Sequence, residues 1–262
     1  MSRRRLAALL HRLARPRFGG PDETRALAAR AAQGGPWVGA FVNAHAVNLC
    51  AADPAAAAAF EGADLLLRDG TGVSMLMRLA GRAPGPDMNG TDLIPALCAG
   101  RRVALYGGRP GVAEAAARRL EARGAHVVAA RHGFHPASDY LRWLAEDAGP
   151  GGAELVILGL GMPRQEALAL RLRAAAPTPV GILCGGAVLD FLAGRTPRAP
   201  AFMRRAGFEW LFRLGLEPRR LFGRYVIGNP LFLLRAPALA AAMRRGARPE
   251  DGNERQRPAI AA

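Results

Sequence analysis

The sequence predicts an α/β fold in which a Rossmann-like parallel sheet is flanked by helices and followed by a helical C-terminal appendage. Short apolar runs alternate with segments of helical periodicity, glycine follows most of the runs, and the alternation stops after Arg195. Apolar runs without polar alternation are typical of strands that helices cover on both faces. A regular succession of such strands and helices indicates a parallel sheet.

Six apolar runs are the expected strands, and seven segments between and after them are the expected helices. The strands are expected at 37–42, 64–67, 102–107, 126–130, 154–161 and 179–186. The helices are expected at 45–61, 71–80, 91–99, 111–123, 138–147, 164–175 and 187–193. Beyond Arg195 no segment has the pattern of a strand. Two or three helices, separated at "EPRR" and "GNP", are expected there instead.

Charge divides the chain into a neutral body and two basic ends. The net charge is +15, of which residues 1–20 contribute +6 and residues 195–262 contribute +9. We expect a basic N-terminal arm over 1–20, an α/β body over 21–194, a membrane-proximal appendage over 195–245 and a disordered tail over 246–262. Basic ends suit an anionic partner such as a lipid surface, a nucleic acid or a phosphorylated substrate, or they only keep the protein soluble.

The cysteines indicate the redox state of the compartment, and the apolar segments indicate whether the chain crosses a membrane. Three widely separated cysteines fit neither a disulfide framework nor a metal site, which favours a reducing compartment. No run reaches about 18 uninterrupted apolar residues, so no transmembrane helix is expected. The nearest candidate is residues 225–243, which are interrupted by Asn229, Pro230, Arg235 and Pro237.

Glycine and polar residues gather where the expected strands end. Asn43, Asp69, "GGRPG" (107–111), "GLGMPRQE" (159–166) and "CGGAVLD" (184–190) all follow strands. Ligands of open parallel sheets bind beyond the carboxyl ends of the strands, and glycine lets backbone N–H groups approach an anion. The pattern therefore favours a nucleotide-like ligand. Gly107, Gly108, Gly161 and Gly185 are the candidate contacts in these turns.

Known phosphate and metal motifs are missing from the sequence. A chain without lysine cannot form the G-x-x-x-x-G-K-[ST] loop, and "GLGMPRQE" lacks the G-x-G-x-x-G spacing, so NAD binding is poorly supported. His132 and His135 lie close together without a third ligand nearby, so no metal site is expected. Asn48, Glu166 and Glu209 are expected to form hydrogen bonds and pack rather than to bind a ligand.

Seven segments resemble, in content and order, the WecG/TagA/CpsF family of bacterial glycosyltransferases, which are of the N-acetylmannosaminyltransferase type. The resemblance covers roughly residues 36 to 235. The segments are "VNAHAVNL", "ADLLLRDGTGVSMLMRLAG", "NGTDLIPALC", "VALYGGRPGVAEAAARRL", "ELVILGLGMPRQE", "GGAVLDFLAGRTPRAP" and "GFEWLFRLGLEPRRLFGRY".

The resemblance implies an enzyme that transfers a sugar from a UDP-sugar to an undecaprenyl-diphosphate-linked acceptor, with inversion and without a required metal or other cofactor. It implies that Asp69 is the catalytic base and that Asn43 lies beside the substrate. On its residues alone, Asp69 is equally well a turn or helix-capping aspartate. Phe41 stands where the family has a threonine near the sugar site, so it bears on the identity of the donor.

The resemblance also implies substrate contacts from Gln165 and from appendage arginines, which are Arg213, Arg219, Arg220 and Arg224. An inverting transfer needs a general base, and arginines suit a departing diphosphate because they hold its oxygens by paired hydrogen bonds. The appendage is expected to meet the anionic inner face of the cytoplasmic membrane, partly through Phe232 and Leu233. The body is expected to stay folded without it.

Two hypotheses follow for the function. The first is a peripheral cytoplasmic enzyme that adds a hexose or N-acetylhexosamine in exopolysaccharide or cell-envelope polymer synthesis. The "FVNA" and "NGTDL" forms resemble the exopolysaccharide branch of the family. The second is a non-catalytic nucleotide- or nucleic-acid-binding protein that uses its basic ends. Arginines interleaved with bulky aliphatic residues favour a bilayer interface, so no nucleic-acid partner is expected, and a homo-oligomer is left open.

Overall fold

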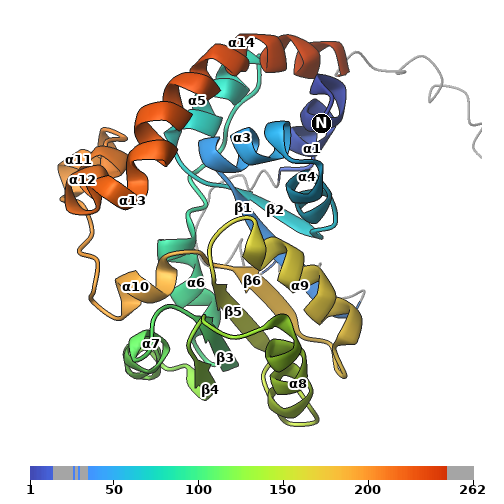
Figure 1. The fold of residues 1–262 in the computed structure, drawn as a ribbon, viewed down its shortest axis with the longest axis vertical. Coiled ribbons are helices and arrows are strands. Elements are labelled where there is room, and N and C mark those ends of the chain that lie inside the picture. The colour runs from blue at the N-terminus through green and yellow to red at the C-terminus, as the bar shows by residue number, and fades with distance from the viewer. Residues whose placement is uncertain (14–25, 27–28, 30–34, 247–262) are drawn as a thin grey trace, which may run out of the picture.

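One parallel sheet forms the centre of the molecule (Figure 1). The computed structural model describes residues 1–13, 26, 29 and 35–246. Its strands are β1 (Trp37–Val42), β2 (Leu65–Arg68), β3 (Arg102–Gly107), β4 (His126–Arg131), β5 (Leu155–Gly159) and β6 (Gly181–Cys184). They lie in the order β2-β1-β6-β5-β3-β4, and every neighbouring pair is parallel. The predicted α/β fold is confirmed.

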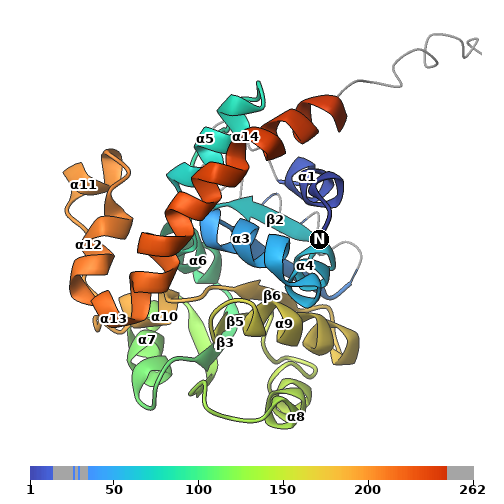
Figure 2. The same cartoon turned by 45° about the horizontal axis from the view of Figure 1, so that its top comes forward.

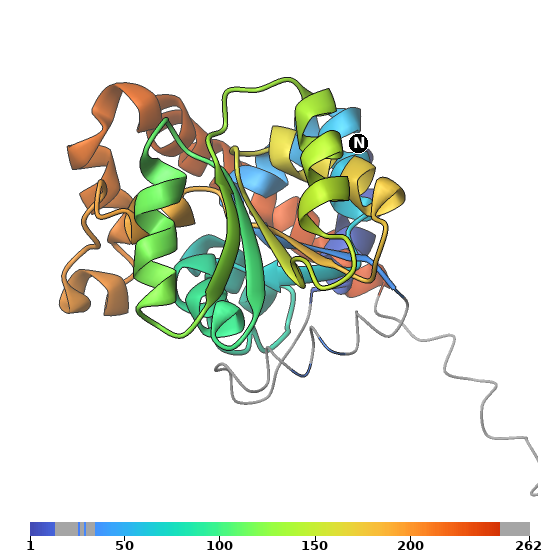
Figure 3. The same cartoon turned by 90° about the horizontal axis from the view of Figure 1, so that it is seen from below.

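Helices pack on both faces of the sheet, as the uninterrupted apolar runs predict. Figure 3, which views the molecule from below, shows α7 and the pair α8 and α9 on opposite sides of the sheet. One core layer includes α3 (Ala44–Ala52), α4 (Pro54–Glu61), α5 (Thr71–Leu79), α8 (Ala137–Asp147) and α9 (Arg164–Ala175). The other includes α6 (Gly90–Cys98), α7 (Val112–Glu121) and α10 (Val188–Leu192).

The helix expected over 45–61 is two helices. Asp53 ends α3 in an extended conformation, and its carboxylate accepts a hydrogen bond from the N–H of Ala55 at 2.8 Å. Pro54 is the first residue of α4, where a missing N–H costs nothing. The chain therefore stops and restarts a helix within three residues.

The strand connections diverge between β3 and β5, which pair directly. β3 leads through α7 to β4 on one side, whereas β5 leads through α9 to β6 on the other. Gly107 and Gly159 are partners in this ladder, and a Cβ on Gly107 would lie 2.5 Å from the Gly159 backbone. Such a divergence at the carboxyl ends of parallel strands is where open α/β sheets bind ligands.

The appendage contains helices and no strand in its described residues. It consists of α11 (Ala201–Arg205), α12 (Glu209–Leu216), α13 (Pro218–Phe222), a π-helical turn η1 (Gly223–Ile227) and α14 (Gly228–Gly246). The break expected at "EPRR" is present at Glu217, but the break expected at "GNP" is wrong. Residues 218–246 form one continuous helix. The wider π turn just before Pro230 explains how the helix accommodates a proline ring there.

α14 crosses the body and shares its core. Phe232, Leu239 and Met243 are at most 3% exposed and belong to the same apolar layer as β1 and α5. Figure 2 shows α14 running over α5 toward α1. One expectation is therefore corrected, because Phe232 is a core residue and does not face a membrane. Removal of the appendage would uncover part of this core, so the independent folding of the body stays a prediction.

The first residues of the chain also belong to this core. α1 (Arg3–His11) packs against α14 through Leu6 and Leu10, which are at most 2% exposed. Arg5 forms an ion pair with Glu61 at the end of α4. The described part of the expected basic arm is thus docked on the body. Residues 14–20 of that arm and residues 247–262 of the expected tail lie outside the described residues.

The continuous helix over residues 218–246 is long and apolar enough to cross a membrane by length and composition. Its best window has a mean hydropathy of 1.4, and 33% of that window is buried inside the protein. Arg235 donates a hydrogen bond to Asn48 of α3 at 2.7 Å, so this helix is tied to the body by a polar contact as well. Length and composition alone do not test the expectation that the chain has no transmembrane helix, which therefore stays a prediction.

Candidate functional site

Asp69 follows β2 and meets Asn43, which follows β1. The two strands pair with Val42 opposite Arg68, so the residues that come next are side by side. The Asn43 Nδ2 group donates to the Asp69 carboxylate at 3.1 Å, while its Oδ1 accepts from the N–H of Ala46 at 3.1 Å. Asn43 thus caps α3 and orients the carboxylate at once. The structure brings together two residues that the resemblance singled out.

Arg68 fixes the turn that carries this carboxylate. Its side chain is buried, and its guanidinium donates to the carbonyl of Gly70 at 3.2 Å, to that of Pro84 at 3.1 Å and to the Ser74 hydroxyl. It also lies 3.3 Å from the carboxylate of Asp87, which accepts from the N–H of Gly70 at 3.0 Å. No signal in the sequence pattern singled out Arg68.

The electrostatic surroundings of Asp69 suit a proton acceptor. Burial raises the pKa of its carboxyl above the ordinary value, and Asp87 raises it further. The hydrogen bond from Asn43 and the charges of Arg224 and Arg213 lower it. A carboxylate with a raised pKa is a stronger base, while the opposing charges help to keep it ionised.

Two further ionisable side chains interact with the charged groups around Asp69. His45 is in the first turn of α3, and burial, together with the charge of Arg224, lowers its pKa to about 4. It is therefore neutral at physiological pH. Burial raises the pKa of Glu209, Arg198 lowers it, and Asp69 raises it again. Glu209 was expected only to pack and form hydrogen bonds, and its electrostatic interaction with Asp69 was not predicted, because the sequence does not show where α12 lies.

Arg213 and Arg224 each have a buried Nε atom for which the described part of the chain offers no hydrogen-bond acceptor. Arg213 lies over the Phe191 ring at 5.2 Å, and Arg224 over the Tyr225 ring at 5.4 Å. Buried donors without acceptors are costly, so these two arginines are well placed to receive an anionic ligand.

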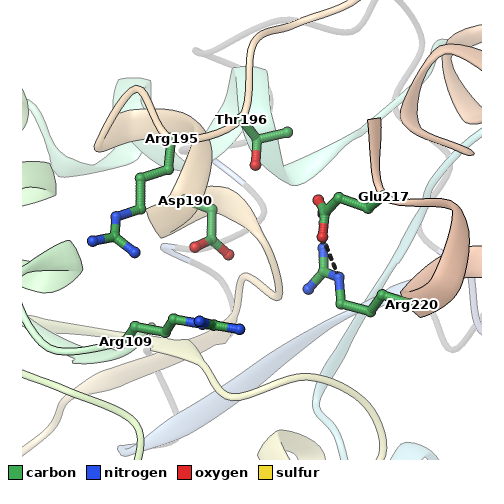
Figure 4. A pocket seen from close by; sticks show the side chains of 6 residues that line it. All are labelled: Arg109, Asp190, Arg195, Thr196, Glu217 and Arg220. Atoms are coloured by element: carbon green, nitrogen blue, oxygen red, sulfur yellow. Dashed lines mark hydrogen bonds and ion pairs between the residues drawn. The ribbon is translucent and has the colours of Figure 1, made fainter. Parts of the chain in front are cut away.

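Arg220 lines a pocket between the body and the appendage, and Arg219 does not, although both residues are exposed. The pocket has a volume of about 380 Å³, and Figure 4 shows its lining. The lining residues are Arg109, Asp190, Arg195, Thr196, Glu217 and Arg220. Arg109, Asp190, Arg195 and Glu217 were not predicted, because their convergence depends on how the appendage packs.

The predicted glycines lie at the carboxyl edge of the sheet, and Gln165 connects two of their turns. Its Oε1 accepts from the N–H of Gly161 at 3.2 Å and of Gly186 at 3.0 Å. Its Nε2 donates to the carbonyl of Cys184 at 3.2 Å, and the side chain is fully buried. We therefore place Gln165 among the residues that shape the site, rather than among those that touch a ligand.

The remaining predicted glycines differ in the space around them. Gly107 and Gly108 have positive φ values of 154° and 72°, and a Cβ on Gly185 would lie only 2.5 Å from the Val188 side chain. Gly161 has φ 80° and open space where a side chain would stand. Backbone at Gly161 is therefore accessible to a ligand, while the other three allow close packing of the strand ends.

Phe41 and the pair of histidines were also considered from the sequence. Phe41 is 3% exposed and packs in the core beneath Gly90 at the start of α6. His132 and His135 place their Nε2 atoms 3.1 Å apart. Among the described residues, no three His, Cys, Asp or Glu side chains are grouped as a metal site would require.

Comparison with known proteins identifies the family. The profile of the glycosyl transferase WecG/TagA/CpsF family matches residues 18–248. A protein of Bacillus spizizenii is 29% identical over 173 residues, which are 64% of this chain and 66% of the relative. One of Bacillus subtilis is 28% identical over 162 residues, 60% of this chain and 62% of the relative. Both are named N-acetylglucosaminyldiphosphoundecaprenol N-acetyl-beta-D-mannosaminyltransferase, and the matches span less than two thirds of their lengths. With the family profile covering most of its residues, the chain belongs to the WecG/TagA/CpsF family of glycosyl transferases.

Proposed function

We propose that the protein is an inverting glycosyltransferase that moves a hexose or N-acetylhexosamine from a UDP-sugar to an undecaprenyl-diphosphate-linked glycan. The observation that carries the proposal is the Asp69 carboxylate, held by Asn43 at 3.1 Å and facing cations of the appendage. Family membership supports sugar transfer, and the names of both relatives include a diphosphoundecaprenol acceptor. Synthesis of an exopolysaccharide or another envelope polymer is the process we assign to it.

Asp69 acts as the general base. Its carboxylate takes the proton of the acceptor hydroxyl as that oxygen attacks the anomeric carbon of the donor sugar. The bond from that carbon to the UDP oxygen breaks in the same displacement, and the configuration inverts. Asn43 and Arg68 position the carboxylate, since one holds the side chain and the other holds the turn.

Cations of the appendage stabilise the departing UDP. Its diphosphate gains negative charge as the bond breaks, and fixed arginines meet that charge without reorganisation. Arg213 and Arg224, whose charges act on Asp69, carry buried Nε atoms that find no acceptor among the described residues, and Arg220 lines the nearby pocket. This arrangement supports a reaction that requires no metal ion.

The exposed apolar surface of the appendage is the proposed membrane contact. Its large side chains are 38–80% exposed and lie among arginines, as membrane-interface helices require. The set comprises Phe202, Phe208, Leu211, Leu216, Phe222, Val226, Ile227, Leu231, Leu233 and Leu234. We place this surface on the inner face of the cytoplasmic membrane, where it brings a lipid-linked acceptor to the end of β2.

Turnover of an Asp69→Asn variant tests the proposal. We expect turnover to fall by roughly 10²–10⁴-fold while UDP still binds, because the amide keeps the shape but accepts no proton. Asp139→Asn on α8, remote from β2, serves as the matched control and should retain activity. The assay screens UDP-sugars against lipid-diphosphate acceptors. Near-normal turnover by purified Asp69→Asn protein would remove Asp69 from the mechanism.

A further inference from the structure

The pocket between body and appendage presents cations from three separate segments. Arg109 follows β3, Arg195 follows α10, and Arg220 belongs to α13. Figure 4 shows Arg109 directed toward the space between Asp190 and the pair formed by Glu217 and Arg220. Within the described residues, the Arg109 and Arg195 side chains make no hydrogen bond or ion pair. Their donors are available to a ligand.

Arg220 has its donors occupied by a neighbour on its own segment. Its Nη2 donates to Glu217 Oε1 at 2.8 Å, and its Nε forms an ion pair with Glu217 Oε2. These two N–H groups form one edge of the guanidinium fork, which is the edge that binds two oxygens of a phosphate. Glu217 therefore occupies the position on Arg220 that a phosphate would take.

We propose that this pocket binds the diphosphate of the nucleotide donor between Arg109 after β3, Arg195 after α10 and Arg220 of α13, and that Glu217 is a carboxylate placeholder which the diphosphate displaces. The proposal rests on the proposed function. It adds two binding residues and one competing residue to the site. It also implies that donor binding joins the body to α13, since the three cations come from both parts.

The position of the pocket favours the donor over the lipid-linked acceptor. Arg109 lies in the turn after β3, at the divergence of β3 and β5 where open sheets bind nucleotides. Asp190 follows β6, which is two positions from β2, so about 10 Å separates the two strand ends. The charge of Arg213 lowers the pKa of both the Asp69 and the Asp190 carboxyl. The pocket and Asp69 thus share a cationic neighbour at the carboxyl edge of the sheet.

Equilibrium binding of UDP to the full chain, measured by calorimetry, tests the proposal. Glu217→Gln keeps the shape but removes the competing charge, so we expect the Kd for UDP to fall about three- to fivefold. Arg109→Gln and Arg195→Gln should each raise it roughly tenfold. In an Arg220→Gln background, Glu217→Gln should bring no gain. Glu154→Gln, which removes an exposed partner of Arg102 at the far end of β3, is the matched control.

The outcomes separate the possible failures. If the wild-type chain bound no UDP, the proposed function itself would fail. If it bound UDP, and a folded Glu217→Gln variant bound it no more tightly, the placeholder would be refuted. If the arginine variants weakened farnesyl diphosphate binding and left UDP binding unchanged, the pocket would belong to the acceptor. We expect the arginine variants to lose affinity equally for UDP and for inorganic pyrophosphate, and to bind farnesyl diphosphate as the wild type does.

Discussion

Phe232 and Leu234 lie two positions apart on α14, yet one is 1% exposed and the other 80% exposed. The Phe232 ring packs over Gly72 in the first turn of α5, with 3.4 Å to the position of a Cβ there. Replacing Phe232 with alanine leaves a cavity in the core that α14 shares with β1. Such a change costs about 3–5 kcal/mol, which lowers Tm by roughly 10 °C in a protein of this size.

Leu234→Ser should behave in the opposite way. A surface change of this kind alters stability by about 0.5 kcal/mol or less. Insertion of an exposed leucine into a bilayer interface contributes about 1–2 kcal/mol, so its loss should weaken vesicle binding roughly tenfold. Thermal unfolding followed by circular dichroism and sedimentation with vesicles rich in anionic phospholipid measure the two properties independently.

Either half of this comparison can fail. If Phe232→Ala unfolded within about 2 °C of the wild type, α14 would not be anchored in the core as described, since a smaller loss than about 1 kcal/mol is incompatible with a filled site. If Leu234→Ser bound vesicles as the wild type does, the proposed membrane surface would lie elsewhere.

Four further outcomes are expected. Activity should fall as the pH drops through the raised pKa of Asp69, because only the carboxylate accepts a proton. Asp87→Asn removes a charge that raises this pKa, so pH–rate profiles should show the acidic limb at lower pH. If the acidic limb stayed at the same pH in this variant, Asp87 would not influence the pKa of Asp69. Arg68→Met should cost about 2–4 kcal/mol in denaturant unfolding and greatly reduce turnover, because its buried hydrogen bonds fix the turn that carries Asp69. EDTA should leave turnover unchanged; loss restored by magnesium would contradict the role given to the arginines.

The fold was predictable because local signals agreed with it. Each apolar run that helices cover on both faces became a strand, and Asn43 and Asp69 met because they follow paired strands. Where the prediction was wrong, neighbouring groups outweighed the local pattern. Pro54 ended one helix and began another, whereas Pro230 did not end a helix because a π turn precedes it.

The appendage shows the limit of sequence reasoning more clearly. Its composition indicated helices and a lipid surface, but a nearly uniform apolar pattern does not say which side of α14 faces the body. Phe232 and Leu233 could not be told apart by that pattern, although one is buried and the other 52% exposed. For the same reason the pocket residues Arg109 and Arg195 carried no signal, since they converge only after α13 docks beside them.

The π turn η1 lets one helix contribute both to the proposed catalytic centre and to the proposed membrane surface. It stands between the exposed α13 and the docked α14, and it carries Arg224, Tyr225, Val226 and Ile227. The charge of Arg224 lowers the pKa of the Asp69 carboxyl, and Tyr225 is buried. Val226 and Ile227, the next residues, are 42% and 59% exposed. Because π turns are rare and recur at functional sites, the sharp change of face within these residues is best understood as a constraint of function. A base in the rigid body and cations on a helix anchored in its core then meet beside an apolar surface, which is where a lipid-linked acceptor would arrive.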